Sequence, residues 1–162
     1  MENPKVSIII PHWNGVDILT DCLESLILTE YNNYEIIVVD NASTDGSPDL
    51  VTLNFPQVKL VENSRNYGYA GGCNRGAKIS KGEYLVFLNN DTTQDPNWLF
   101  PLVDFLKLNT KVAAVQPKIL NFYDRTKFDY AGGAGGWLDI LGFPFARGRI
   151  FQDLETDKGQ YD

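Results

Sequence analysis

Histidine, cysteine and long apolar runs are scarce in this sequence. The few cysteines argue against a cysteine-based metal or redox site, and the lack of long apolar runs argues against a membrane span. The chain of 162 residues has one histidine and two cysteines, Cys22 and Cys73, whose spacing fits neither a metal site nor a redox motif. We therefore expect two buried free thiols. No stretch approaches the roughly 18 consecutive apolar residues of a membrane span, and MENPKVSIII lacks the basic start and long apolar region of a secretion signal. The expected location is cytoplasmic, with the inner face of a membrane reached only through regions outside this chain.

Positive charge is also in short supply. Lys and Arg number 14 against 21 Asp and Glu, which gives a formal net charge of -7, and the basic residues form no cluster. A nucleic-acid surface is therefore excluded, because neutralising phosphates requires clustered Lys and Arg. An anionic ligand would need help from a metal ion or from backbone N–H groups. The remaining composition, 43% apolar and 22% charged, is typical of a globular domain large enough to bury a core.

Short apolar runs rich in β-branched residues alternate with helical patterns along the first 120 residues. Expected strands cover residues 5–10, 34–40, 58–63, 83–88 and 111–120, and expected helices cover 14–30, 47–54, 70–80 and a segment after Pro96. This alternation implies right-handed crossovers, so the predicted class is α/β, with a Rossmann-like, mostly parallel sheet flanked by helices. From residue 121 onward, Gly and aromatic residues without a clear period predict loops or hairpins with little core.

Polar residues gather where the first four expected strands end, which is where open α/β sheets bind ligands. Trp13 has a flat face suited to stacking on a nucleobase, and Asp40 is suited to accepting hydrogen bonds from the base edge. The alternatives are that Trp13 is a core aromatic and Asp40 a helix cap. His12, the single histidine, fits a structural or a simply exposed position better than a catalytic one.

Two further polar segments follow later strands. GYAGGCNRG lacks the spacing of a dinucleotide fingerprint and the Lys of a P-loop, so its glycines allow either close approach to a ligand or close packing of a helix on the sheet. Asn74 and Arg75 are the polar groups that it offers to a nucleotide; the alternative for Arg75 is a solvated surface position. In FLNNDTT, Asn90 and Asp91 supply oxygen ligands of the kind that Mg²⁺ and Mn²⁺ prefer. The alternative is that they cap a turn.

Four of these segments resemble those of a known family. VSIIIPHWNG, EIIVVDNASTDGS, NYGYAGGCNRGA and GEYLVFLNNDT stand in the order and at the intervals of the family 2 glycosyltransferases, which are inverting enzymes with the GT-A nucleotide-diphospho-sugar transferase fold. The resemblance is greatest to bacterial rhamnosyltransferase-like members that build surface polysaccharide. It implies a donor-binding α/β core over residues 1–120 and the start of the acceptor-side region over residues 121–162.

The resemblance also implies roles for individual residues of the nucleotide site. Pro11 and Trp13 stand where the family's first loop holds the base of a sugar nucleotide. Asp40 stands where a carboxylate contacts the nucleoside. Asn74, together with Arg75, matches a donor-site position in the Gly-rich segment. The donor implied is a nucleotide-diphosphate sugar, with UDP- and dTDP-linked sugars as the leading candidates, and the acceptor is a saccharide.

The metal site is implied in the same way. Asp91 matches the last acid of the family's Asp-X-Asp-type motif, which binds the divalent metal, Mg²⁺ or Mn²⁺, on the diphosphate. Asn89 and Asn90 replace acidic residues that often precede it, and they are expected to contact the nucleotide. An amide supplies an oxygen but no charge, so this departure bears on the ribose contacts and on metal affinity.

The implied reaction is direct displacement at the anomeric carbon by an acceptor hydroxyl, which needs a general base to take the hydroxyl proton. No segment after residue 120 matches the family's base motif. We therefore expect a fragment that binds a sugar nucleotide without transferring the sugar. The alternative functions are a noncatalytic nucleotide-binding or interaction module and, third, a nucleotidyltransferase. PHWNG disfavours the last, because such enzymes usually carry basic residues directly after the first strand.

Overall fold

The computed structural model describes residues 3–129, 133–150 and 152–161 of the chain. The chain divides into two compact units, Met1–Val103 and Asp104–Asp162. The boundary expected at residue 120 lies inside the second unit and stays a prediction about function.

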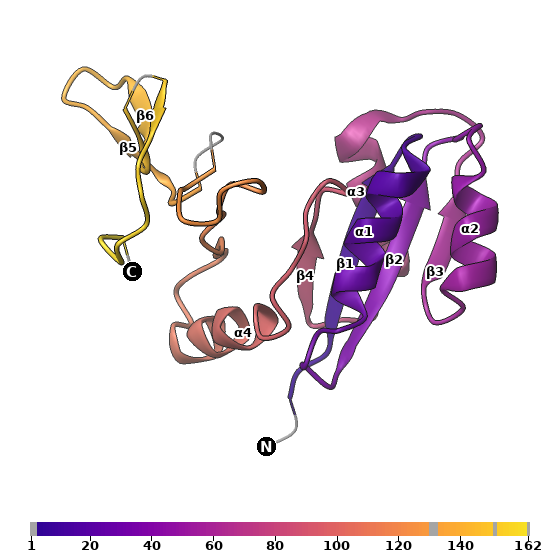
Figure 1. The fold of residues 1–162 in the computed structure, drawn as a ribbon. Helices are drawn as coiled ribbons and strands as arrows, with labels where there is room; N and C mark the ends of the chain where they lie inside the picture. Colours follow the sequence, from indigo (N-terminus) through magenta and orange to yellow (C-terminus); the bar gives the residue numbers. More distant parts are fainter. Residues whose placement is uncertain (1–2, 130–132, 151, 162) are drawn as a thin grey trace. The chain divides into compact units, whose positions relative to one another are not determined.

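The first unit is built on a four-stranded parallel sheet flanked by helices (Figure 1). Its elements in chain order are β1 (Val6–His12), α1 (Val16–Leu26), β2 (Tyr34–Asp40), α2 (Ser47–Asn54), β3 (Lys59–Glu62), α3 (Gly68–Ile79), β4 (Tyr84–Phe87) and the start of α4 (Leu99–Leu108). The strand order is β3-β2-β1-β4, and every neighbouring pair is parallel. The predicted α/β, Rossmann-like class is confirmed, and the four strands lie close to their expected bounds.

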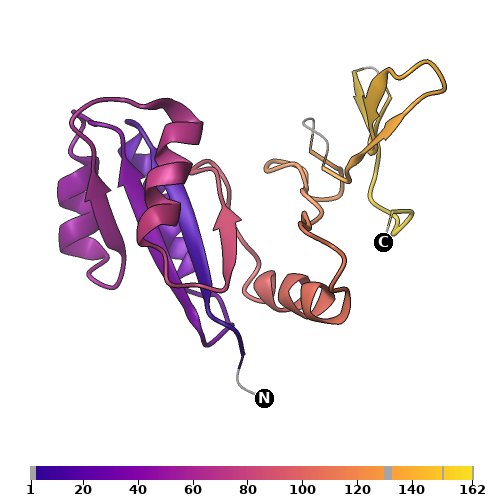
Figure 2. The ribbon, with the colours of Figure 1, turned by 180° about the vertical axis from the view of Figure 1, so that it is seen from behind.

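Helices cover both faces of this sheet, as Figures 1 and 2 show from opposite sides. Ile8 and Ile10 of β1 join the larger core cluster, to which α1 and α2 also contribute. Ile9 and Val39 belong to the other face, where Ala77 of α3 packs against them. Successive residues of a strand point to opposite faces, so a strand covered on both sides must be apolar throughout. This explains the apolar run of residues 8–11 at the centre of β1.

α3 lies close to the sheet because glycine occupies its contact positions. A Cβ added at Gly72 would lie 2.8 Å from the Cβ of Pro11, and one added at Gly76 would overlap the side chain of Ile9. Close packing of a helix on the sheet is therefore the role of these two glycines in GYAGGCNRG. The packing brings the first turn of α3 to the end of β1.

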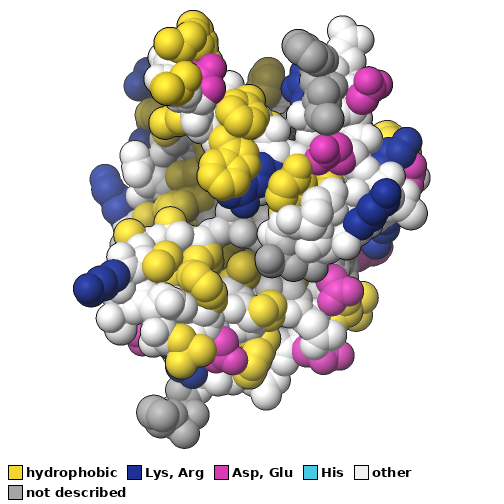
Figure 3. Space-filling model, turned by 90° about the vertical axis from the view of Figure 1, so that its left-hand side faces the viewer, with side chains coloured by type: hydrophobic (Ala, Val, Ile, Leu, Met, Phe, Trp, Pro, Cys, Tyr) yellow, Lys and Arg dark blue, Asp and Glu magenta, His cyan; other side chains and the backbone are white. Residues whose placement is uncertain are grey.

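Short strands and loops make up the second unit after α4. β5 (Gly136–Leu138) pairs with β6 (Pro144–Ala146), and β7 (Arg149–Ile150) pairs with β8 (Asp153–Leu154), both antiparallel. Phe128 is fully buried in this unit, whereas large apolar side chains of the β5–β6 hairpin, such as Trp137 and Phe143, stay exposed. Hydrophobic side chains are accordingly frequent on the face shown in Figure 3. Hairpins with little core were expected here, and they are found.

The strand predicted over residues 111–120 does not form. Within it only Leu120 makes an isolated bridge, to Phe128, and Val112 is exposed. An apolar run becomes a strand only where a neighbouring strand supplies hydrogen-bond partners, and Pro117 has no N–H to donate. This prediction was wrong because the apolar pattern carries no information about the partner.

Both cysteines are buried free thiols, as expected. Burial raises the pKa of the Cys22 thiol to about 12, so this thiol stays protonated and unreactive. Within the described parts of the chain, no helix combines the length and the apolar character needed to cross a membrane.

Candidate functional site

The loops after β1, β2 and β4 leave the sheet at one edge. In the parallel register His12 lies beside Asp40, and Ile9 lies beside Phe87, so the carboxyl ends of these strands are neighbours. The N–H of Asn41, the first residue after β2, donates to the carbonyl oxygen of His12 at 2.8 Å. The polar segments identified in the sequence therefore meet where open α/β sheets bind ligands.

The first two loops hold each other in place. The N–H of Asn14 donates to Ser43 Oγ at 2.9 Å, and the N–H of Thr44 donates to Asn14 Oδ1 at 2.9 Å. Asn14 and Ala42 both have a left-handed backbone, with φ of 55° and 64°. Non-glycine residues in this conformation are uncommon and occur where the surrounding contacts enforce it, often at functional sites. The two loops thus form one preorganised support.

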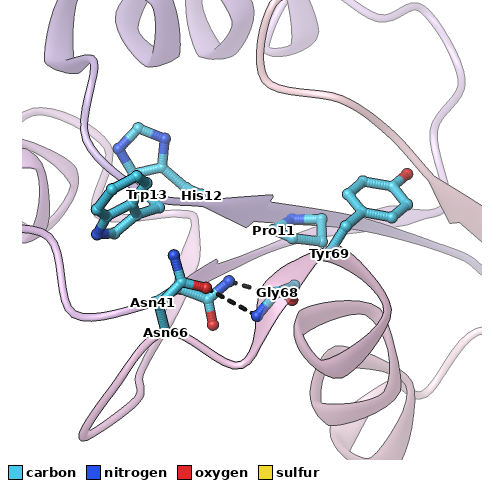
Figure 4. A pocket seen from close by; sticks show the side chains of 7 residues that line it. All are labelled: Pro11, His12, Trp13, Asn41, Asn66, Gly68 and Tyr69. Carbon is cyan, nitrogen blue, oxygen red and sulfur yellow. Dashed lines mark hydrogen bonds between the residues drawn. The ribbon is translucent and has the colours of Figure 1, made fainter.

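A pocket of about 190 Å³ opens beside this support. Its lining consists of Pro11, His12, Trp13, Asn41, Asn66, Gly68 and Tyr69. Figure 4 shows the rings of Trp13 and Tyr69 at opposite ends, with Asn41, Asn66 and Gly68 between them. Trp13 is 58% exposed, so it is not a core aromatic, and its ring face is available for stacking.

Asp40 carries a buried acceptor that no donor reaches. Its side chain is 2% exposed; Oδ2 accepts from the N–H of Ser43 at 2.9 Å, whereas Oδ1 has no partner among the described residues. α2 begins after Gly46, so Asp40 does not cap that helix. Buried polar atoms without a partner are rare, and a carboxylate oxygen is a strong acceptor. An N–H group of a ligand would satisfy Oδ1.

Asn41 organises the far wall of the pocket. Its Oδ1 accepts from Asn63 Nδ2 at 3.0 Å and from the N–H of Tyr67 at 3.4 Å, while its Nδ2 donates to the carbonyl oxygen of Gly68 at 3.4 Å. Asn66 Oδ1 accepts from the N–H of Gly68 at 2.7 Å. These bonds, two of them drawn in Figure 4, attach the loop before α3 to the end of β2.

Four residues of the lining have no binding role predicted from the sequence, namely His12, Asn41, Asn66 and Tyr69. Asn41 directly follows Asp40, which is the one signal that pointed to it. Asparagines in loops most often serve turns, so composition does not separate those that line a pocket. The position of Tyr69 follows from the packing of α3, which sequence periodicity does not place in space.

His12 is buried and uses both ring nitrogens, which agrees with the structural role expected for it. Nε2 lies 2.9 Å from Ser47 Oγ, and Nδ1 lies 2.9 Å from Asn90 Nδ2. Burial lowers the pKa of His12, although the carboxylates of Asp40 and Asp45 act in the opposite direction. The neutral imidazole is therefore favoured, and it links the loops that follow β1, β2 and β4.

The loop after β4 leaves two polar side chains free. Asn89 and Asp91 are exposed, and neither makes a side-chain hydrogen bond or ion pair within the described part of the chain. The turn itself is closed by Thr92, whose Oγ1 donates to the carbonyl oxygen of Asn89 at 2.9 Å. Asp91 is thus not needed to cap the turn.

The residues present fit a divalent metal that takes most of its ligands from a substrate. No group of three or more His, Cys, Asp or Glu side chains that could hold a metal occurs in the described ranges, so an all-protein metal cage is not formed there. A free carboxylate and an amide oxygen, at Asp91 and Asn89, suit Mg²⁺ or Mn²⁺ completed by diphosphate and water. Asp91 also lies near the pocket, because its charge contributes to the raised pKa of Tyr69, after burial and the contact with Cys73.

The two predicted residues of α3 lie beyond the pocket lining. Asn74 is exposed, and the guanidinium of Arg75 lies 3.8 Å from the centre of the Tyr67 ring. Arg65 lies over the same ring at 4.8 Å. Neither arginine pairs with a carboxylate among the described residues, so both keep their charge available for an anion.

The model of the family described as "Glycosyl transferase family 2" matches residues 7–157. The chain belongs to this family. A poly(ribitol-phosphate) beta-glucosyltransferase of Bacillus spizizenii is 36% identical over 111 residues, which are 65% of this chain and 18% of that protein. The O-antigen biosynthesis protein RfbC of Myxococcus xanthus is 34% identical over 148 residues, 89% of this chain and 11% of that protein. The chain thus spans less than a fifth of either relative.

Solved structures agree with the family in fold. A mannosyltransferase of Pyrobaculum calidifontis, in complex with GDP-Man and Mn²⁺, matches with a TM-score of 0.60 and 26% identity over 73% of this chain and 34% of its own. S. aureus TarS 1–349 in complex with UDP matches with a TM-score of 0.61 and 22% identity over 72% of this chain and 39% of its own. The second likeness shows the fold alone. The resemblance predicted from the four segments and the GT-A type of fold are confirmed.

Proposed function

We propose that this chain forms the donor-nucleotide half of an inverting, metal-dependent glycosyltransferase, with residues 1–120 as the donor core and residues 121–162 as the start of the acceptor side. The observation that carries the proposal is the partnerless Oδ1 of Asp40, buried at the strand edge where the exposed ring of Trp13 lines a pocket. An aromatic face and a buried acceptor are the two groups that bind a nucleobase, by stacking and by an N–H bond.

The donor is a nucleotide-diphosphate sugar. Uracil and thymine each present an imide N–H, which matches the unmet acceptor of Asp40, so UDP and dTDP are the first candidates. A guanine N1–H would match it too, and the mannosyltransferase from P. calidifontis was solved with GDP-Man. Pro11 completes the base site, and Asn74 and Arg75 face the rest of the donor.

Asp91 would hold the divalent metal, Mg²⁺ or Mn²⁺, against the diphosphate, with Asn89 and Asn90 next to the nucleotide. When bound there, the metal neutralises negative charge that builds on the departing diphosphate. The chain's own part is to present a free carboxylate on an anchored loop: Gln94 N–H donates to Ser25 Oγ of α1 at 3.1 Å, which fixes the far side of that loop. The solved mannosyltransferase carries Mn²⁺, which supports this assignment.

The acceptor is a saccharide or polymer of the cell surface. The relatives in Bacillus spizizenii and Myxococcus xanthus are named for poly(ribitol-phosphate) glucosylation and O-antigen biosynthesis, and they motivate this choice. Transfer with inversion needs a carboxylate general base for the acceptor hydroxyl. No residue of the chain is assigned that role, so we expect donor binding without sugar transfer.

Calorimetric titration with UDP, dTDP and GDP, with and without Mn²⁺, tests the proposal. We expect one nucleotide to bind, to bind more tightly with Mn²⁺, and to lose the effect of Mn²⁺ in Asp91→Ala. Asp21→Ala is the matched control, because Asp21 is also an exposed acid but lies on α1. Equal loss in both variants would point to net charge alone, and no nucleotide binding at all would remove the proposal.

A further inference from the structure

A chain of hydrogen bonds runs through His12 and joins the three loops of the site. Asn90 Nδ2 is a donor, so His12 Nδ1 accepts from it at 2.9 Å and the ring proton lies on Nε2, which donates to Ser47 Oγ at 2.9 Å. Ser47 Oγ donates in turn to Asp45 Oδ1 at 2.5 Å. Asp45 Oδ2 accepts from the first N–H groups of α1, those of Gly15 and Val16.

The two ends of this series of hydrogen bonds are held in different ways. The hydrogen bond from Ser47, together with backbone N–H groups, lowers the pKa of Asp45 to about 2, so Asp45 is a charged and fixed end at the loops after β1 and β2. The other end, Asn90, precedes Asp91 directly. The loop after β4 has a second anchor at Gln94, whose N–H donates to Ser25 Oγ. Asp91 lies between the two anchors, and His12 supplies the one nearer to the pocket.

His12 also lines the nucleotide pocket. His12 therefore borders the nucleotide site, and its buried ring holds the residue next to the free carboxylate. We propose that His12 is a positioning residue that sets the Asp91 loop relative to the nucleotide pocket, so that nucleotide and divalent metal bind cooperatively. This inference rests on the proposed function, and it adds a residue that the family motifs did not single out in this sequence.

The two ring nitrogens can be tested separately. The amide of a glutamine reaches the position of Nε2, and the amide of an asparagine reaches that of Nδ1. His12→Gln therefore keeps the bond to Ser47 and loses the bond to Asn90, whereas His12→Asn keeps the bond to Asn90 and loses the bond to Ser47. Ser47→Ala removes the bond to His12 Nε2 together with the bond to Asp45 Oδ1, leaves the bond to Asn90 in place, and serves as the matched control.

The measurement is the enhancement of nucleotide affinity by Mn²⁺, taken as the ratio of the Kd values without and with the metal. We expect His12→Gln to reduce this ratio about tenfold, in line with the loss of one buried hydrogen bond. His12→Asn and Ser47→Ala are expected to keep the ratio, even where the nucleotide binds more weakly overall. A merely structural role would weaken both Kd values together and leave the ratio unchanged in all three variants.

A spectroscopic readout covers the case in which His12→Gln does not fold. The chain has a single histidine, so the imidazole ¹⁵N resonances of the wild-type chain are unambiguous. We expect the tautomer protonated at Nε2, with Nδ1 accepting. Protonation at Nδ1 would overturn the inference.

The outcomes distinguish a failure of the role of His12 from a failure of the proposed function. A wild-type chain whose nucleotide affinity rises with Mn²⁺, together with an unchanged ratio in His12→Gln, overturns the role of His12 and leaves the proposed function standing. A wild-type chain that binds no nucleotide removes the proposed function and this inference with it.

Discussion

Two carboxylates of the same strand, β2, show how the two ends of the sheet differ. Glu35, near the start of β2, has every oxygen satisfied: Oε1 accepts from Ser7 Oγ at 2.6 Å and from the N–H of Lys81 at 2.7 Å, and Oε2 accepts from Lys59 Nζ at 2.6 Å. Asp40, at the end of the strand, has one oxygen bonded and the other without a partner. Both side chains are largely buried.

We interpret this difference as a division of roles, in which Glu35 contributes to stability and Asp40 is proposed to bind a ligand. Partial burial by itself raises the pKa of Glu35, but the hydrogen bonds from Lys59, Ser7, the N–H of Lys81 and Lys5 together lower it to about 2. The folded state therefore stabilises the charged form of Glu35. Asp40 is buried without such compensation, which costs free energy that a ligand donor would restore. Glu35 holds the amino ends of the strands together, whereas we propose that Asp40 accepts a hydrogen bond from a ligand at their carboxyl ends.

Asp40→Asn is the most direct test of the difference between the two carboxylates. The amide oxygen keeps the bond to Ser43, but an NH₂ group replaces the free oxygen and opposes the N–H of the base. We expect nucleotide affinity to fall about thirtyfold, or about 2 kcal/mol, with the free energy of unfolding unchanged or raised. Calorimetry and urea unfolding measure the two effects. A variant that binds normally would show that Oδ1 does not contact the ligand.

Glu35→Gln is expected to do the reverse. The amide cannot bear the charge that Lys59 and Lys5 neutralise, so the free energy of unfolding should fall by about 1 to 2 kcal/mol. The nucleotide Kd should stay within about twofold of the wild-type value, since Glu35 lies at the opposite edge of the sheet from the pocket. A matching loss of nucleotide affinity would contradict the division of roles.

Low pH should destabilise the wild-type chain, because Glu35 loses its charge. The pKa of Glu35 is lowered from 4.5 to about 2 in the folded chain, so the unfolded chain takes up the proton first as the pH falls. The stabilisation is present above about pH 4.5 and is lost as the pH falls toward 2. The free energy of unfolding, measured at several pH values, should depend less steeply on pH for Glu35→Gln than for the wild type. Equal slopes would assign the acid sensitivity to other carboxylates.

The smallest expected effect is at Trp13. Trp13→Ala removes the stacking surface and should weaken nucleotide binding about three- to tenfold, whereas Trp13→Phe should keep most of the affinity. Trp13 is 58% exposed, so thermal unfolding should shift little in either variant. Strong destabilisation by Trp13→Ala would mean that the ring belongs to the fold and not to the pocket.

The fold was predictable to the extent that each element carries its own signal. The central residues of β1 and β2 are apolar because both faces of the sheet are covered, and that pattern could be recognised in the sequence. The helix expected over residues 14–30 covers only Val16–Leu26. Asn14 and Gly15 have positive φ, so the helical backbone begins only after them. The strand expected over residues 111–120 failed for want of a partner, which no local signal reports.

The sequence predicted which residues belong to the site better than it predicted their contacts. Pro11 and Trp13 line the pocket, and Asp40 is buried at the expected strand end. Their binding roles, like those of Asn89 and Asp91, stay predictions. Asn90 is partly engaged by His12, so at most its remaining groups face a nucleotide. Local patterns in the sequence do not pair these two side chains, which lie 78 positions apart in the chain.

The sequence by itself determined the α/β class, the family and the strand ends at which polar residues collect, because these depend on local periodicity and on short motifs. The tertiary structure alone decided which of those polar atoms are satisfied. It gave Glu35 donors on both oxygens, left Oδ1 of Asp40 without one, and placed His12 between Ser47 and Asn90. Hydrogen-bond partners depend on the register of the strands and on where loops meet, and both are settled only when the chain packs.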